Sequence, residues 1–207
     1  MTMTGQGWRL ECPSEFDGGA AFFEGILDDM PQMGLIEAVD CIGDVEYYHG
    51  TSKRTMRFNK AFASPEIDEA LSWAENPTTP ELQQIFAKMD SNRQKAVQKF
   101  AAIRLWTTEA VCYVVTSLMR DRNRSATSLA PILPYLRLLL SGLHRLPDTY
   151  LFEGTLFRAE SNVRSNWDST MQPGKTFGFF TLTSFSTDPE AIANFRWQKH
   201  FGLANGF

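Results

Sequence analysis

From residue 64 onward, apolar residues recur at the three- and four-residue steps of amphipathic helices. Two helix starts are marked by a capping side chain followed by proline and an acid, Ser64-Pro65-Glu66 and Thr79-Pro80-Glu81. Asn76-Pro77 and Ser91-Asn92 are typical of helix ends, since proline and short polar residues interrupt the helical ladder. The pattern therefore predicts two helices before residue 91.

The middle of the chain predicts further helices. Residues 96–120 form one long helix, or two if Thr107-Thr108 interrupts it, because β-branched residues with hydroxyls compete for backbone partners. Residues 121–128 are charged and rich in hydroxyls, which predicts a loop. Leucines recur at helical steps from Leu129 to Leu146, and a stripe of this kind is typical of core packing. Pro147 ends that helix.

From Tyr150 on, the pattern changes from helices to strands. Residues 150–152 and 155–157 are short β-like runs, and residues 177–184 are rich in Phe and Thr. Thr187-Asp188-Pro189-Glu190 then predicts a helix start, with a capping residue, a proline and an acid near the positive end of the helix dipole. Helices followed by strands predict an α+β fold.

Residues 1–64 give weaker signals and are interpreted as an N-terminal extension of unclear role. Residues 36–45 fit either a strand or a short helix. Tyr47-Tyr48-His49-Gly50-Thr51 resembles one strand of the poly-ADP-ribose polymerase class. That class also needs a tyrosine some tens of residues on, and the next one, Tyr113, falls in a predicted helix. A plain strand ending in a glycine turn is therefore the favoured interpretation.

Composition and charge narrow the function classes. The 207 residues, 43% hydrophobic and 21% charged, are typical of a soluble globular protein with one domain, or one plus an extension. A net charge of -4 argues against a broad nucleic-acid or anionic-membrane surface. Three cysteines far apart indicate reduced thiols without a disulfide framework or zinc spacing. We see no signal peptide and no apolar run near about 20 residues, so a cytoplasmic protein without a membrane span or bound metal is expected.

Two predicted strand ends carry the polar groups that a phosphate-bearing ligand needs. Thr155-Leu156-Phe157 leads to Arg158, whose guanidinium is a planar fork of donors. Residues 177–182 lead to Thr183-Ser184-Phe185-Ser186, whose hydroxyls both donate and accept. The plain alternatives are a surface cation for Arg158 and structural serines in a strand. No serine, cysteine and histidine arrangement suggests a hydrolase triad.

The order of these residues resembles the arginine-type mono-ADP-ribosyltransferases, which carry an Arg, a Ser-x-Ser and a Glu-x-Glu motif in that order. The resemblance covers about residues 96–200. The matching passages are Ile103-Arg104-Leu105-Trp106-Thr107 with Tyr113 and Leu118-Met119-Arg120, Leu136 to Pro147, Thr155-Leu156-Phe157-Arg158, and Phe180 to Ser186 with Asp188 and Phe195. It implies one domain over residues 65–207, with a helical subdomain at 65–146 and a mostly antiparallel β core with a helix at 150–207.

The resemblance also implies a role for each matched residue. Arg158 would hold the phosphates of NAD, the co-substrate. Ser184 would support the catalytic glutamate and contact the nicotinamide-side ribose, while Ser186 would brace the same strand. ADP-ribose would pass to a protein side chain, with arginine the expected acceptor, or to water, and nicotinamide would leave. A carboxylate near the anomeric carbon would stabilise the oxocarbenium-like state.

Two departures from the family pattern matter. The family has glycine after the arginine, where the backbone approaches the nicotinamide amide, and here the residue is Ala159. No glutamate follows Glu190, so the Glu-x-Glu is absent and the β core is expected to be incomplete at its C-terminal end. Glu160 lies two residues from Arg158 and Glu190 fits a first-turn helix acid, so neither is favoured as a substitute.

Three alternatives remain open beside the enzyme. They are a non-catalytic NAD-binding or protein-interaction domain of the same fold, an inactive fragment, and a purely helical interaction module that does not bind NAD.

Overall fold

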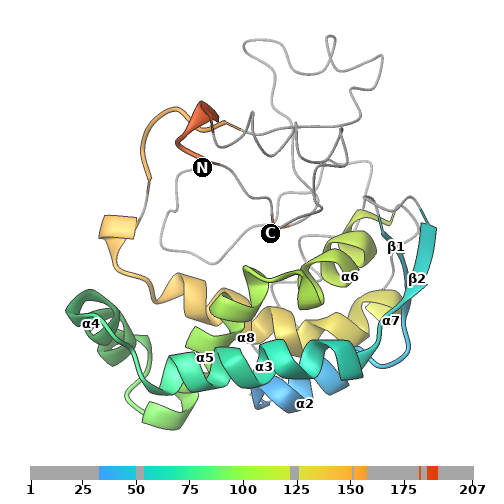
Figure 1. Cartoon of the computed structure of the whole chain (residues 1–207), viewed down its shortest axis with the longest axis horizontal. Coiled ribbons are helices and arrows are strands. Elements are labelled where there is room, and N and C mark those ends of the chain that lie inside the picture. Colours follow the sequence, from blue (N-terminus) through green and yellow to red (C-terminus); the bar gives the residue numbers. More distant parts are fainter. Residues whose placement is uncertain are drawn as a thin grey trace, which may run out of the picture. The chain divides into compact units, whose positions relative to one another are not determined.

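The computed structural model describes residues 33–49, 54–121, 126–150, 152–157, 182 and 186–190 (Figure 1). The chain divides into two compact units. Described residues up to Tyr150 belong to the first unit, and those from Phe152 onward belong to the second. The first unit combines helices with a two-stranded antiparallel sheet, so the mixed α+β class is confirmed. The predicted division at residues 64 and 65 stays a prediction.

The first unit begins with a short helix and a hairpin. Helix α2 spans Leu35–Asp40, which decides between the two readings of residues 36–45 in favour of a helix. Strand β1 (Glu46–His49) pairs antiparallel with β2 (Arg54–Arg57), and Tyr47 lies opposite Met56. The strand predicted around Tyr47 is therefore confirmed, whereas β2 is a strand that the sequence pattern did not predict.

Helix α3 spans Lys60–Glu75 and begins earlier than predicted. The start expected at Ser64-Pro65-Glu66 is wrong, because the side chain of Asn59 accepts the N–H of Ala61 and caps the helix there. Pro65 lies inside the helix, where it lacks one backbone donor. The helix tolerates this loss because one face is buried in the core, through Ala63, Ile67, Ala70 and Ala74.

Three further helices follow, and they are α4 (Pro80–Met89), α5 (Arg93–Trp106) and α6 (Glu109–Arg120). Helix α4 begins at a predicted start signal, while α5 begins three residues before the predicted residue 96. Their capping residues are Thr79, Asn92 and Thr108, whose side-chain oxygens accept from the N–H groups of Leu82, Lys95 and Ala110. The interruption predicted at Thr107-Thr108 is confirmed, and it separates α5 from α6.

The single helix predicted from Leu129 to Leu146 is divided. Helix α7 spans Ala126–Leu129, a 3₁₀ turn η1 spans Ala130–Ile132, and α8 spans Leu133–His144. The C-terminal boundary of the loop predicted at 121–128 is therefore wrong, because α7 begins at Ala126. Within the described part of the chain, no helix is long and apolar enough to cross a membrane.

The strands predicted at 150–152 and 155–157 are largely absent from the described backbone. A 3₁₀ turn, η2, spans Asp148–Tyr150 and follows Pro147. In residues 152–157, Phe157 alone is paired with another strand segment.

Helix α5 is central to the first unit and packs against α3, α4, α6 and α8 (Figure 1). Its partner α8 approaches closely at Gly142, where a Cβ atom would lie 3.0 Å from the carbonyl oxygen of Lys99. Tyr135 of α8 is fully buried, and its hydroxyl donates to the carbonyl oxygen of Ala102 at 3.0 Å. The leucine stripe of α8 thus faces the core, as its spacing predicts.

Candidate functional site

One antiparallel bridge joins the two predicted strand ends of the second unit. The N–H of Phe157 donates to the carbonyl oxygen of Ser186 at 2.8 Å, and the N–H of Ser186 donates to the carbonyl oxygen of Phe157 at 2.9 Å. Reciprocal bonds of this kind define a hydrogen-bonded pair in an antiparallel ladder. The bridge therefore connects the residue before Arg158 to the second serine of the Ser-x-Ser sequence.

A hydrogen-bonded turn follows the bridge directly. The Oγ atom of Ser186 accepts from the N–H of Asp188 at 3.0 Å. The Oδ1 atom of Asp188 accepts from the N–H of Glu190 at 2.8 Å, while Pro189 and Glu190 are helical. The helix start predicted at this place is confirmed, with Asp188 as its capping residue. Residues 186–190 are called the Ser186 turn below.

The described backbone contains one of the four residues assigned to NAD binding from the sequence. Ser186 lies in the bridge, where its hydroxyl accepts a local backbone hydrogen bond. Arg158, Ala159 and Ser184 lie outside the described residues, as does Glu160. Glu190 is exposed at the helix start, the position in which its first-turn interpretation puts it.

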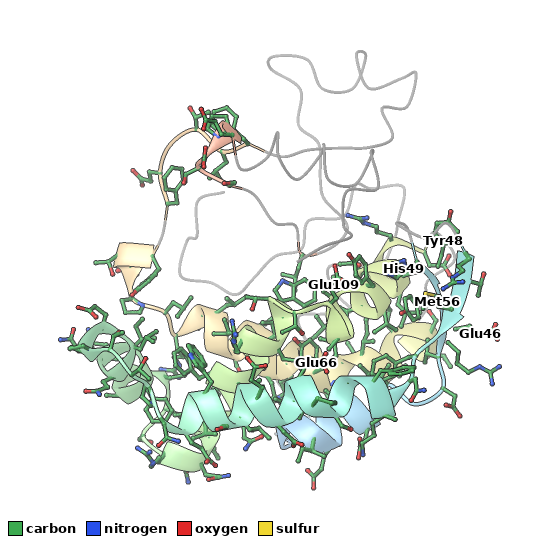
Figure 2. All side chains as sticks on the ribbon, in the orientation of Figure 1. Glu46, Tyr48, His49, Met56, Glu66 and Glu109 are labelled. Carbon is green, nitrogen blue, oxygen red and sulfur yellow. The ribbon has the colours of Figure 1, made fainter. Side chains whose placement is uncertain are left out.

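A second polar group of side chains lies where β1 meets α6 in the first unit, and it includes His49 and Tyr113, whose contact the sequence pattern did not predict. The rings of His49 and Tyr113 are 4.3 Å apart between centroids and tilted by 52°. The hydroxyl of Tyr113 donates to Oε1 of Glu109 at 3.0 Å. Tyr48 also connects the two elements, because its N–H donates to Oγ of Ser117 at 3.0 Å (Figure 2).

Tyr47 completes this cluster on the same strand, with its ring 6.3 Å from that of His49. Burial raises the pKa of Tyr47 above its ordinary value, and repulsion from Cys112 adds to the effect. The raised pKa keeps the Tyr47 phenol protonated at physiological pH. His49 and Tyr113 lie far apart in the sequence, so no local spacing could have revealed their contact.

Arg104, part of the passage that resembles the transferase family, belongs to the α3–α5 contact. Its Nη2 donates to Oε1 of Glu69 at 3.1 Å, and its guanidinium lies 5.8 Å from the ring centre of Trp73. Its Nε is buried without a hydrogen-bond partner, as is Oε2 of Glu66 of α3, which is labelled in Figure 2. The described side-chain contacts of Arg104 are therefore with Glu69 and Trp73 of α3.

Metal ligands do not gather in the described residues, where no group of three or more His, Cys, Asp or Glu side chains is placed to hold an ion. Comparison with known proteins assigns no family or function to the chain. No protein-family model matches the chain, no curated protein matches it in sequence, and no solved structure matches it.

Proposed function

We propose that the chain is an ADP-ribosyltransferase-type domain that binds NAD beside the Phe157–Ser186 bridge. It transfers ADP-ribose to a protein side chain, with arginine the expected acceptor, and releases nicotinamide. The second unit would then form the mostly antiparallel β core that the resemblance implies.

The bridge is the observation that supports the proposal best. Arg158 follows Phe157 directly, and Ser184 precedes Ser186 by two residues. Consecutive Cα atoms are about 3.8 Å apart, so covalent connection alone limits how far these two residues can be from the bridge. A guanidinium and a hydroxyl attached to neighbouring strands suit one ligand that has both phosphate and ribose groups.

The chemistry also needs a carboxylate. In the transfer, the bond between nicotinamide and the anomeric carbon of the ribose breaks, and a bond from that carbon to the acceptor forms while the acceptor loses a proton. The positive charge that develops on the sugar is stabilised by a nearby carboxylate. Within the 207 residues no glutamate follows Glu190, and Glu190 itself lies at a helix start.

A second candidate function is non-catalytic NAD binding beside the same Phe157–Ser186 bridge. The two functions share Arg158 and the serines and differ in turnover alone. A protein that binds NAD without cleaving it would have no need of a Glu-x-Glu.

Turnover of a fluorescent NAD analogue separates the two candidates. If the 207-residue chain turns over the analogue and Arg158→Ala abolishes this turnover, the transferase is supported. Glu160 and Glu190 are then the next residues to substitute. Binding of the analogue without turnover supports the non-catalytic domain. Arg145→Ala is the matched control, because Arg145 is an exposed arginine of the first unit. If the unmodified chain neither binds the analogue nor turns it over, both candidates are overturned.

A further inference from the structure

We propose that Asp188 is a positioning residue that holds the register of the Phe157–Ser186 bridge. It thereby controls NAD affinity without touching the ligand. The effect on NAD rests on the function proposed above, whereas the effect on register does not.

A continuous set of hydrogen bonds connects Asp188 to the bridge. Its carboxylate accepts from Glu190 at 2.8 Å, and its own N–H donates to Oγ of Ser186 at 3.0 Å. Ser186 in turn exchanges both backbone bonds with Phe157. Asp188 therefore fixes the backbone on one side of Ser186, while Phe157 fixes Ser186 across the ladder.

An isolated bridge needs such support, because one residue pair specifies register weakly. A slip by one residue moves every side chain of a strand to its opposite face. Ser186 is itself a member of the bridge, so a slip by one residue would turn its side chain to the opposite face. A turn that begins within Ser186 itself opposes that slip.

The carboxylate of Asp188 is well suited to this task. A hydrogen bond from a backbone N–H to an ionised acceptor is stronger than one between neutral groups. The acceptor also lies at the start of a helical segment, where the local dipole favours negative charge and where Pro189 has no N–H of its own to satisfy. Removing the side chain takes away the bond from the N–H of Glu190 and loosens the Ser186 turn, while the bond from the N–H of Asp188 to Ser186 stays.

Three variants of the full 207-residue chain test the proposal. Asp188→Ala removes the acceptor, and Asp188→Asn keeps an oxygen in the same place. Asn59→Ala is the matched control, since Oδ1 of Asn59 accepts from the N–H two residues on at 2.9 Å in the first unit. Amide hydrogen exchange of Phe157 and Ser186 measures the register, and titration with NAD measures the effect on the ligand.

Asp188→Ala is expected to speed exchange of both amides about fivefold and to weaken NAD binding by a similar factor. Asp188→Asn is expected to restore both within about twofold, because an amide oxygen also caps helices. Asn59→Ala should change neither. Rescue by asparagine distinguishes a positioning acceptor from a general effect of charge or stability.

Each other outcome has a distinct meaning. Unchanged exchange in Asp188→Ala overturns the register role, whatever NAD does. Faster exchange with an unchanged NAD affinity overturns the connection between register and ligand. Faster exchange in a chain that never binds NAD supports the register role and refutes the proposed function. An asparagine variant that behaves like alanine overturns the hydrogen-bond explanation.

Discussion

The rings of Trp73 and Phe100 stack with centroids 4.6 Å apart and planes inclined by 29°, which joins α3 to α5. Phe86 of α4 meets Phe100 edge-on at 6.0 Å. An arginine lies over each outer ring. Cζ of Arg104 is 5.8 Å from the ring centre of Trp73, and Cζ of Arg93 is 5.3 Å from the ring centre of Phe86. This stack joins α3, α4 and α5.

Phe100→Ala is expected to lower the free energy of unfolding by about 3–5 kcal/mol, because it removes a buried ring and leaves a cavity. Phe62→Ala is the control, since Phe62 is 80% exposed against 3% for Phe100. Urea unfolding followed by circular dichroism measures both. Equal losses in the two variants would refute the assigned role of the stack.

Asp90→Asn tests the partly buried ion pair in which Nζ of Lys99 lies 2.8 Å from Oδ2 of Asp90. The Lys99 hydrogen bond, followed by the N–H of Asn92, holds the pKa of Asp90 below its ordinary value of 3.8. A lowered folded-state pKa adds stability above pH 3.8 that is lost as the pH falls through the folded value.

We therefore expect Asp90→Asn to cost about 1–2 kcal/mol at neutral pH, and the difference from the unmodified chain to shrink below pH 3.8. Asp40→Asn removes the exposed ion pair with Lys60 and should cost less than about 1 kcal/mol. Chemical unfolding across this pH range measures both. A difference that stays constant with pH would contradict the assigned ion pair.

Much of the helical unit could be predicted from the sequence because its signals are local. Thr79, Asn92 and Thr108 each precede a helix that they cap, and a cap acts within one turn. Where two local signals compete, the prediction fails: Asn59 caps α3 although Ser64-Pro65 is the stronger start pattern. The residues that the Asn59 cap adds before Pro65 are mostly exposed, with Ala63 buried, so the cap and not burial marks the start of the helix.

Features that depend on distant residues could not be predicted. Strand β2 has arginine at both ends and little apolar character, so its pairing with β1 rather than its own pattern makes it a strand. The contact between His49 and Tyr113 is similarly non-local. For the candidate site, the sequence predicted two polar strand ends, but the pairing of Phe157 with Ser186 depends on register, which no local pattern encodes.

Gly142→Ala is expected to destabilise the chain although alanine favours helices. A Cβ at this position would lie 3.0 Å from the Lys99 carbonyl oxygen and 3.1 Å from Cδ1 of Ile103. Overpacking costs about 1–3 kcal/mol, and the gain in helix propensity offsets about 1 kcal/mol of it. Thermal unfolding beside Ser141→Ala measures the net loss, and a gain in stability would show that α5 and α8 are not so close.

Tyr135→Phe is expected to cost about 1 kcal/mol at neutral pH through loss of the hydrogen bond to Ala102.

Burial, with repulsion from Cys112, raises the pKa of Tyr135 well above 10.0. As the pH rises past 10.0, the phenol ionises in the unfolded chain before it does so in the folded chain, so the free energy of unfolding falls. The phenylalanine variant has no phenol and lacks this loss of stability. Unfolding near neutral and alkaline pH, beside Tyr150→Phe at an exposed tyrosine, tests both effects. Equal alkaline losses in the unmodified chain and in Tyr135→Phe would count against a buried phenol.

Isothermal titration of NAD into the 207-residue chain tests binding beside the Phe157–Ser186 bridge most directly. We expect saturable binding that Arg158→Ala weakens roughly tenfold to a hundredfold, because a charge-assisted hydrogen bond contributes about 1.5–3 kcal/mol. Arg145→Ala should leave the Kd unchanged. No binding by the unmodified chain, or the same Kd in Arg158→Ala, would contradict the proposed function.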